Sequence, residues 1–264
     1  MQKMFLLFAA ALLLAGCNFN SESAVVSGEL DETDAFVTIV KVKSPILLDG
    51  KLDDLAWQKA PAVEMCMFDT VTNQPPRQRK LLSLDKFDKA RVKLLYDDKY
   101  LYVGAVLEDD DIMSYAGGDQ QMIFSKGDTF ELFLKHENVL NYWEFHAAPN
   151  GYKACLEFLS RAMPVSNDFI DNSGMMPGFD VASQFNGSFN EHSNTDNFWS
   201  TEMRIPLAEL EKRGKKFVPG EPWRVLFARY NYSSKKSGLQ YSTFPALPVL
   251  SFHTHGYYAL LKFE

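Results

Sequence analysis

Short segments of alternating apolar and polar residues, each bounded by turn residues, recur along most of this chain. Two of them, residues 91–96 and 100–108, flank the polar triplet 97–99, and such three-residue loops are typical of β-hairpins. Helical periodicity over long windows is absent, and we find no internal repeat. The chain is therefore restricted to folds that are built mainly from short strands.

The remaining strand segments allow the fold class to be predicted. They are residues 36–42, 129–135, 142–147, 152–159, 198–205, 223–232 and 257–263. Roughly nine or more short strands with intervening turns predict an all-β, antiparallel β-sandwich, immunoglobulin- or jelly-roll-like. Short helical turns are expected at residues 53–57 and at residues 207–213, the latter capped by Gly214. Residues 69–89 and 160–178 are expected to be loops.

The first residues predict export. A basic start at residues 1–3 precedes an apolar run over residues 4–14, which is too short to span a bilayer and is typical of a signal peptide. The run ends in LAGC at residues 14–17, which matches a lipobox, so Cys17 is expected to carry lipid after removal of residues 1–16. Two or three acyl chains give stable anchoring.

A polar, acidic stretch follows the lipid-bearing cysteine. Residues 17–35 are expected to form a flexible linker, and residues 36–264 the folded domain. Asn18 differs from the aspartate that retains lipoproteins in the inner membrane under the enteric sorting rule. We therefore expect a lipid anchor in the cell envelope, with the outer membrane favoured.

The charge of the chain argues against one class of partner. The formal net charge is −7, and loss of Lys3 with the signal peptide lowers it to −8. An acidic chain without a basic run is poorly suited to nucleic acid, whose binding depends on neutralising phosphates. After lipidation of Cys17, Cys66 and Cys155 remain, either as a disulfide in an oxidising compartment or as free buried thiols.

The order of several motifs resembles the family 9 carbohydrate-binding modules and their DOMON-like relatives. The resemblance covers about residues 40–264, and the order and spacing of the motifs carry it. In this sequence they are LDGKLD at 48–53 with Ala56-Trp57, KLLYD at 93–97, YLYV at 100–103, GDTFELF at 127–133, Trp199 with Glu202 and Ile205-Pro206, and GYYAL at 256–260.

The resemblance implies a β-sandwich that grips sugar ends, often with structural calcium. A sugar ring would lie between two aromatic side chains, which fall at Phe124 and Phe252 in this chain. Its acidic partner would be Glu131, and its basic partner His146. The sequence departs from the family pattern here, because tryptophan is usual at both aromatic positions and arginine at the basic one. A smaller ring stacks less strongly, and histidine offers fewer contacts than arginine.

Strand parity adds candidates for contacts with sugar hydroxyls. Glu144 shares one strand face with His146, and the alternative is that this face is simply solvated. Arg229 shares a face with apolar neighbours, where a structural ion pair is the alternative to a contact with ligand. His253 follows Phe252 directly. With 21 phenylalanines in the chain, any one of them is more often a core residue than a stacking platform for sugar.

Two metal sites were considered. The acidic run at residues 108–111 includes Asp109 and Asp111, which could offer oxygen ligands to calcium, although an acidic turn is the commoner explanation. His253 and His255 would lie on one side of an extended chain, as a transition-metal site requires, but no third ligand is near in sequence. The alternative is that His253 and His255 are ordinary surface histidines, or that His253 contacts the sugar.

The sequence predicts a binding protein and no enzyme. It holds no nucleophile elbow and no thiol-protease context, and nothing sets two carboxylates apart as a glycosidase pair. We expect a monomeric, membrane-anchored lipoprotein that binds oligo- or polysaccharide and supports polysaccharide capture or degradation. One alternative is a haem-binding DOMON-like electron carrier, with His146 and one of Met122, Met175, Met176 or Met203 as axial ligands. The other is a structural or assembly lipoprotein without a small ligand.

Overall fold

The computed structural model describes residues 35–68, 87–161, 166–213, 215–236 and 239–264. The signal peptide at 1–16, the lipidation site Cys17 and the linker up to residue 34 lie outside these residues, as do Gly214 and most of the expected loop at 69–89. Among the described residues, no helix has both the length and the apolar character needed to cross a bilayer.

The described residues form thirteen strands within one continuous hydrogen-bonded sheet. The strands are β1 (Phe36–Lys41), β2 (Val63–Glu64), β3 (Cys66–Phe68), β4 (Ala90–Tyr96), β5 (Tyr100–Glu108), β6 (Thr129–His136), β7 (Tyr142–Ala147), β8 (Lys153–Phe158), β9 (Asp180–Asn186), β10 (Phe198–Pro206), β11 (Trp223–Asn231), β12 (Gln240–Phe244) and β13 (Ala259–Phe263). Short helices are η1 (Leu55–Gln58), η4 (Ile123–Ser125), α1 (Asn167–Ser173), α2 (Leu207–Glu211) and η5 (His255–Tyr257).

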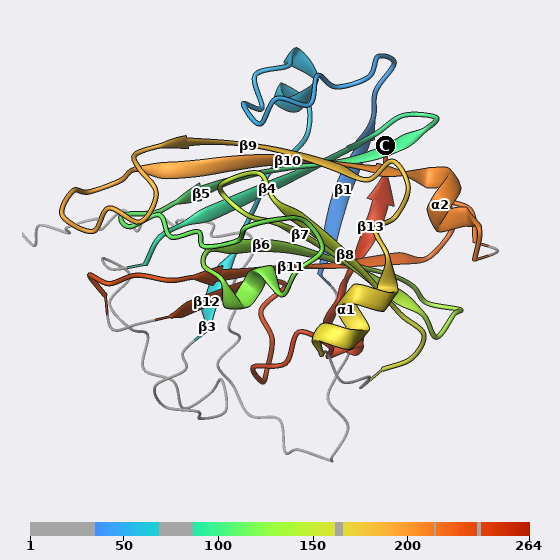
Figure 1. The fold of residues 1–264 in the computed structure, drawn as a ribbon. Coiled ribbons are helices and arrows are strands. Elements are labelled where there is room, and N and C mark those ends of the chain that lie inside the picture. Colours follow the sequence, from blue (N-terminus) through green and yellow to red (C-terminus); the bar gives the residue numbers. More distant parts are fainter. Residues whose placement is uncertain (1–34, 69–86, 162–165, 214, 237–238) are drawn as a thin grey trace, which may run out of the picture.

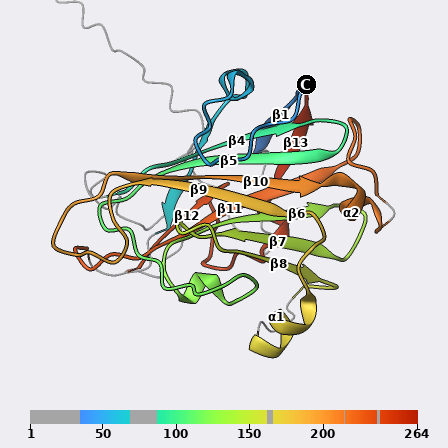
Figure 2. The ribbon, with the colours of Figure 1, turned by 45° about the horizontal axis from the view of Figure 1, so that its top comes forward.

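The sheet folds into two facing layers (Figures 1 and 2). Its strand order is β8-β7-β6-β11-β13-β1-β4-β5-β10-β9, with β12 also paired to β11. We call β8-β7-β6-β11-β12 the first layer and β4-β5-β10-β9 the second; β13 and β1 join them. The all-β class is confirmed. The antiparallel prediction needs one correction, because β1 pairs in parallel with both β13 and β4. The immunoglobulin- or jelly-roll-like topology stays a prediction.

The main core lies between the two layers. Alternate residues of each strand point into it, as the period of two requires. From the first layer come Phe130, Leu132, Trp143, Phe145 and Phe227, and from the second Leu94, Val103, Leu107, Trp199 and Met203, all nearly or fully buried. The opposite, outer face of the first layer carries Glu131, Glu144 and His146.

The outer face of the first layer is covered, so the alternative of a simply solvated face is wrong. A second apolar cluster lies on it, formed by Phe133, Tyr142, Phe158, Leu226, Ala228 and neighbours. Ile170 of α1 and Leu247 and Phe252 of the segment between β12 and β13 pack against these residues. This cover explains why polar side chains on the face are buried.

The 97–99 hairpin between β4 and β5 is confirmed. Asp97 Oδ1 accepts hydrogen bonds from the backbone N–H groups of Lys99 and Tyr100, each at 2.7 Å. Helix α1 was missed within the expected loop 160–178. Its signal was the cap residue Ser166, whose hydroxyl accepts a hydrogen bond from Phe169 N.

Glu202 ties the segment of residues 49–57 to strand β10 of the second layer. This buried carboxylate of β10 accepts backbone N–H groups of Asp49, Gly50 and Leu52 at 2.9–3.2 Å, and the indole N–H of Trp57 at 2.7 Å. Gly50 has φ +81°, and a Cβ there would lie 2.8 Å from the backbone of Ser183. Several motif residues of the sequence resemblance therefore build the scaffold.

Cys155 is a buried free thiol in β8, so the disulfide with Cys66 considered from the sequence is not formed. Burial raises the pKa of Cys155 to about 12. A thiol that stays protonated is a poor nucleophile and a poor metal ligand. Cys155 therefore acts as a small apolar side chain in the core.

Candidate functional site

Two glutamates flank one histidine on the outer face of the first layer. Glu131 of β6 lies directly opposite His146 of β7 in the strand register, and Glu144 is two residues before His146. His146 Nε2 is 3.5 Å from Glu131 Oε1 and 3.3 Å from Glu144 Oε2. All three side chains are almost fully buried, with at most 5% exposed. We call these three residues the carboxylate–histidine cluster.

The two glutamates of the cluster hold protons that exposed carboxyl groups would lose. Burial raises the pKa of Glu131 to about 8 and raises that of Glu144 well above its usual range. Burial lowers the pKa of His146, against the attraction of Glu131. A protonated carboxyl can donate a hydrogen bond as well as accept one. The cluster therefore offers both donors and acceptors at neutral pH.

Two polar atoms of the cluster are buried without a hydrogen-bond partner among the described residues. They are Glu144 Oε1 and His146 Nδ1. Glu144 Oε1 lies 3.3 Å from His253 Nδ1, an atom that is also 2.7 Å from the Tyr142 hydroxyl. An unsatisfied buried polar group costs about 1–3 kcal/mol, and a ligand that bonds to it recovers part of that cost.

Aromatic rings lie beside the cluster. Phe124, in η4, is half-buried; its ring contacts His146 edge-on at 6.0 Å and Tyr230 at 5.5 Å between centroids. Phe252 contacts the same Tyr230 at 5.5 Å but is only 6% exposed. The structure thus brings Phe124 and Phe252 to one face, with Tyr230 between them.

Tyr230 was missed by the sequence analysis. It belongs to β11 and lies on the same face as Ala228, opposite in direction to Arg229. The strand alternation that assigned Arg229 to one face could have assigned Tyr230 to the other. Among 11 tyrosines, nothing else in the sequence marks it.

Arg229 points away from this face into the space between the layers. Its guanidinium lies 3.0 Å from Asp109 Oδ2 and also donates to the carbonyl of Glu108 at 2.7 Å. Both charged groups are 1% exposed or less. The structure therefore places Arg229 in a buried ion pair and separates it from the other six candidates.

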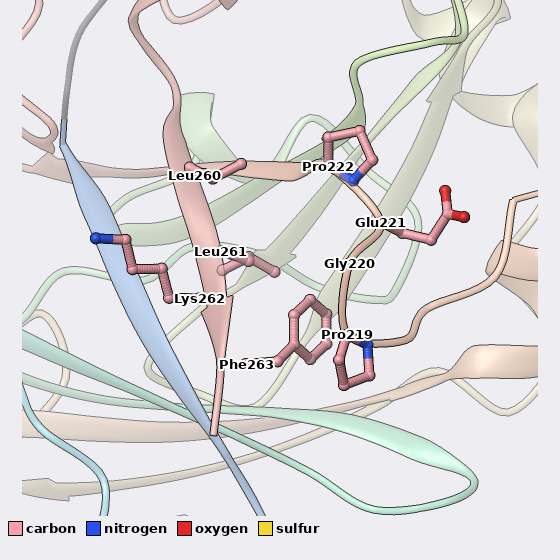
Figure 3. Close-up of a pocket in the computed structure, with 8 residues that line it drawn as sticks. All are labelled: Pro219, Gly220, Glu221, Pro222, Leu260, Leu261, Lys262 and Phe263. Atoms are coloured by element: carbon pink, nitrogen blue, oxygen red, sulfur yellow. The ribbon is translucent and has the colours of Figure 1, made fainter.

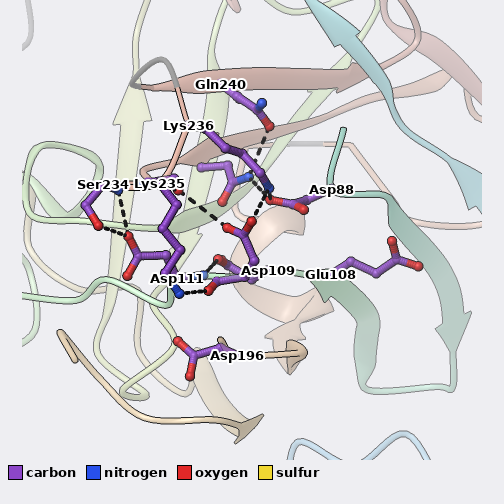
Figure 4. Close-up of polar contacts among 12 residues, drawn as sticks. Asp88, Glu108, Asp109, Asp111, Asp196, Ser234, Lys235, Lys236 and Gln240 are labelled. Atoms are coloured by element: carbon purple, nitrogen blue, oxygen red, sulfur yellow. Dashed lines mark hydrogen bonds and ion pairs between the residues drawn. The ribbon is translucent and has the colours of Figure 1, made fainter. Parts of the chain in front are cut away.

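The acidic run beside β5 forms a compact group with two cations (Figure 4). Ligand atoms of Asp88, Asp109 and Asp110 lie within 4.8 Å of one another. The Lys236 ammonium contacts Asp88 and lies 3.2 Å from Asp110, while Arg229 holds Asp109. Two cations already pair with these three carboxylates, so a calcium ion does not fit among them without displacing Lys236.

Asp111, the second carboxylate considered for calcium, faces elsewhere. Its Oδ2 accepts the backbone N–H and the hydroxyl of Ser234, each at 2.6 Å, and its Oδ1 lies 2.8 Å from His192 Nδ1. Among the described residues, only the Asp88 group brings three potential metal ligands together. His253 and His255 therefore lack a third ligand in this part of the chain.

The axial ligands required by the haem alternative are separated by the sheet. His146 points to the outer face of the first layer, whereas Met175, Met176 and Met203 pack with the core between the layers. Met122 alone packs on the outer face. A single His–Met pair on a covered face gives this alternative little support.

Two surface hollows are lined by other residues. One, of about 340 Å³, lies between residues 219–222 and residues 260–263 of β13 (Figure 3). The other, of about 320 Å³, is formed by residues 98–100 and residues near α2. Neither is lined by a candidate site residue, so the aromatic face is distinct from both.

Comparison with known families decides the assignment. Residues 48–217, more than half of the chain, match the family model described as carbohydrate family 9 binding domain-like. The chain belongs to this family. The family 9 prediction from the sequence is thereby confirmed, and the match spans the Gly50–Trp57 motif, the cluster residues and Glu202. None of the curated proteins matches the chain.

Solved structures share the fold of this family 9 domain. A Bacteroides uniformis protein described as carbohydrate-binding is 14% identical, covers 88% of this chain and 100% of its own, and has a TM-score of 0.61. A family 9 module from Caldicellulosiruptor kristjanssonii is 18% identical and was solved with cellotriose (TM-score 0.52, 86% of this chain, 93% of its own) and with glucose (0.54, 86%, 94%).

The buried glutamates predict a pH dependence of stability. An acid with a raised pKa in the folded chain binds protons preferentially there, so its contribution to stability is lost as pH rises towards the raised pKa. For Glu131 this window ends at about pH 8. We expect the Tm to fall between pH 6.5 and 8, and Glu131→Gln to reduce the fall. Glu64→Gln, at an exposed position, is the control and should show the same fall in Tm as the wild type. An equal fall in Tm in the wild type and in Glu131→Gln would contradict this account.

Proposed function

We propose that this family 9 domain binds oligo- or polysaccharide, without catalysis, on the aromatic outer face of the first layer. The observation that carries the proposal is the pair of buried atoms, Glu144 Oε1 and His146 Nδ1, that have no hydrogen-bond partner in the described part of the chain and lie beside the half-buried ring of Phe124. A pyranose has an apolar face that stacks on aromatic rings and a rim of hydroxyls that need directional partners.

The arrangement offers both kinds of contact within one small area. Phe124 touches Tyr230 and His146, so a sugar stacked on Phe124 would have its hydroxyls within reach of the carboxylate–histidine cluster. The related family 9 module solved with glucose and with cellotriose supports a ligand of one to three sugar units. Sugar hydroxyls must be desolvated on binding, so we expect modest affinity.

The environment of the glutamates favours binding over hydrolysis. A glycosidase pair must flank the scissile bond from two sides and include one ionised carboxylate. Here Glu131 and Glu144 share one histidine, and burial raises the pKa of both. Family 9 modules are generally non-catalytic, which agrees with this geometry.

Calorimetric titration of the full chain in detergent tests the function. We expect saturable binding of a neutral oligosaccharide such as cellotriose, weakened about tenfold by Phe124→Ala through loss of aromatic contact area. Phe124 is preferred to Phe252 because the buried Phe252 also supports the fold. Absence of binding across a panel of glucose-, xylose- and galactose-based oligosaccharides, by a folded protein, would refute the proposal.

We further propose that Cys17 anchors the domain to the outer membrane by lipid, which would hold glycan near the cell for separate enzymes. The lipobox at residues 14–17 supports this. Cys17→Ala should abolish incorporation of a labelled fatty acid and release the protein from the membrane fraction. Continued labelling of the variant would contradict lipidation at this residue.

A further inference from the structure

Basic side chains gather at one end of the aromatic face. We call Lys135, Arg161, His253 and His255 the basic cluster. Lys135 lies one residue before the end of β6, opposite Tyr142 of β7 in the register; Arg161 follows β8, and the histidines belong to the segment before β13. Their presence is notable in a chain with a net charge of −7.

The two histidines are packed around Tyr142 of β7. The His253 Nδ1 atom lies 2.7 Å from the Tyr142 hydroxyl, and the His255 ring centroid lies 4.4 Å from that of Tyr142. Burial, followed by the charges of Lys135, Arg161 and His253, lowers the pKa of His255 to about 4. Burial and Arg161 also lower the pKa of His253. Both histidines therefore lie within the field of the neighbouring cations.

The donors of the basic cluster are not fully used. His255 Nε2 is buried without a hydrogen-bond partner among the described residues. The Lys135 ammonium donates to two backbone carbonyls, of His136 and Val139, and so keeps a third N–H. Glu137, whose charge acts on Lys135, is already paired with Arg224. No described carboxylate forms an ion pair with Arg161.

The nearest acid does not cancel this positive field. Glu144 Oε1 lies 3.3 Å from His253, but burial raises the pKa of Glu144 and favours its neutral form. Glu131 lies beyond His146 and has a raised pKa for the same reason. An anion at the basic cluster would therefore meet cations and neutral donors.

The basic cluster adjoins the proposed sugar site. His253 follows Phe252 in sequence, and the ring of Phe133 contacts both, at 5.9 Å to Phe252 and 5.8 Å to His253. We propose that the basic cluster binds an anionic substituent, a carboxylate or a sulfate, of a glycan held on the aromatic face. This inference rests on the proposed function and specifies its ligand class as acidic polysaccharide.

Matched trisaccharides test the inference on the full chain in detergent. The probes are cellotriose, a uronic-acid trisaccharide and a sulfated trisaccharide, titrated at low and high salt. We expect at least one acidic probe to bind about fivefold or more tightly than cellotriose, with the advantage reduced at high salt. The comparison of uronate with sulfate identifies the preferred anion.

Variants assign the effect to the basic cluster. Arg161→Gln, at an exposed position, and His255→Gln should each remove most of the advantage and leave cellotriose affinity unchanged; Arg91→Gln on the second layer is the matched control. The inference is overturned if both acidic probes bind no more tightly than cellotriose, or if the advantage of the acidic probe survives in both variants. In either case, binding of cellotriose would still support the proposed function. Failure of all three probes to bind overturns both.

Discussion

Glu202→Ala is expected to lower the free energy of unfolding by about 4 kcal/mol. The substitution removes the acceptor of three backbone N–H groups and of the Trp57 indole, all donating at 2.7–3.2 Å. The side chain is 1% exposed, so water cannot readily replace it. For a domain of this size the Tm should fall by roughly 8–16 °C.

Thermal unfolding followed by circular dichroism measures this effect. Glu202→Gln keeps one acceptor oxygen and should fall between wild type and Glu202→Ala. Glu64→Ala removes an exposed carboxylate paired with Arg91 on the same layer, and should change the free energy of unfolding by less than about 1 kcal/mol. A similar Tm for Glu202→Ala and Glu64→Ala would show that the Glu202 contacts do not hold the 49–57 segment.

Arg229→Met should destabilise the fold by about 3–5 kcal/mol, because it leaves the buried carboxylate of Asp109 without its cation. Arg229 and Asp109 are 3.0 Å apart and both almost fully buried. Asp128 lies beside Asp109, but burial and then the charge of Asp109 raise the pKa of Asp128 well above its usual range, so its carboxyl favours the neutral form and does not replace the lost cation. Denaturant unfolding, with the change in midpoint compared at constant slope, measures the loss.

The sign of the pH dependence separates this explanation from simple loss of packing. Burial already raises the pKa of Asp109, and Arg229 opposes that rise. In Arg229→Met the pKa should rise further, so protonation would recover stability as the pH falls from 7 towards 5. The double variant Arg229→Met/Asp109→Leu should be more stable than Arg229→Met at pH 7. Destabilisation that does not change with pH would contradict the charge account.

Much of the fold could be predicted because strand alternation is local. The hairpin of β4 and β5, and strands β6, β7 and β11, follow from residue patterns with a period of two. Strand β9 has no fully buried residue, so its sequence lacks the contrast that marks a strand. The parallel pairing of β1 depends on contacts with β13, more than 200 residues away in sequence.

The candidate site was predictable in part for the same reason. The alternation of side chains along a strand places Glu144 and His146 on one face. The strand register in the structure then places Glu131 opposite His146. Parity alone could not say which face of β11 points between the layers, so Arg229 was grouped with residues on the other side of the sheet. Nor could it show that α1 and the segment before β13 cover the outer face.

Differences in burial also separate the two aromatic candidates. Both phenylalanines lie next to strands in sequence, yet Phe124 is half-buried in a short 3₁₀-helix and Phe252 is a core residue at 6% exposure. A sequence-based choice of Phe252→Ala as a binding variant would have mixed loss of affinity with loss of stability, since truncating a buried phenylalanine costs about 3–5 kcal/mol. Phe124 avoids this.

The location of a bound sugar tests the central claim most directly. Backbone amide chemical shifts of the isotope-labelled full chain would be recorded during titration with cellotriose. We predict that saturable shifts concentrate on the outer face of the first layer, at Phe124, His146, Tyr230 and His253. Shifts confined to the hollow between residues 219–222 and β13, or to the second layer, would contradict the proposed site.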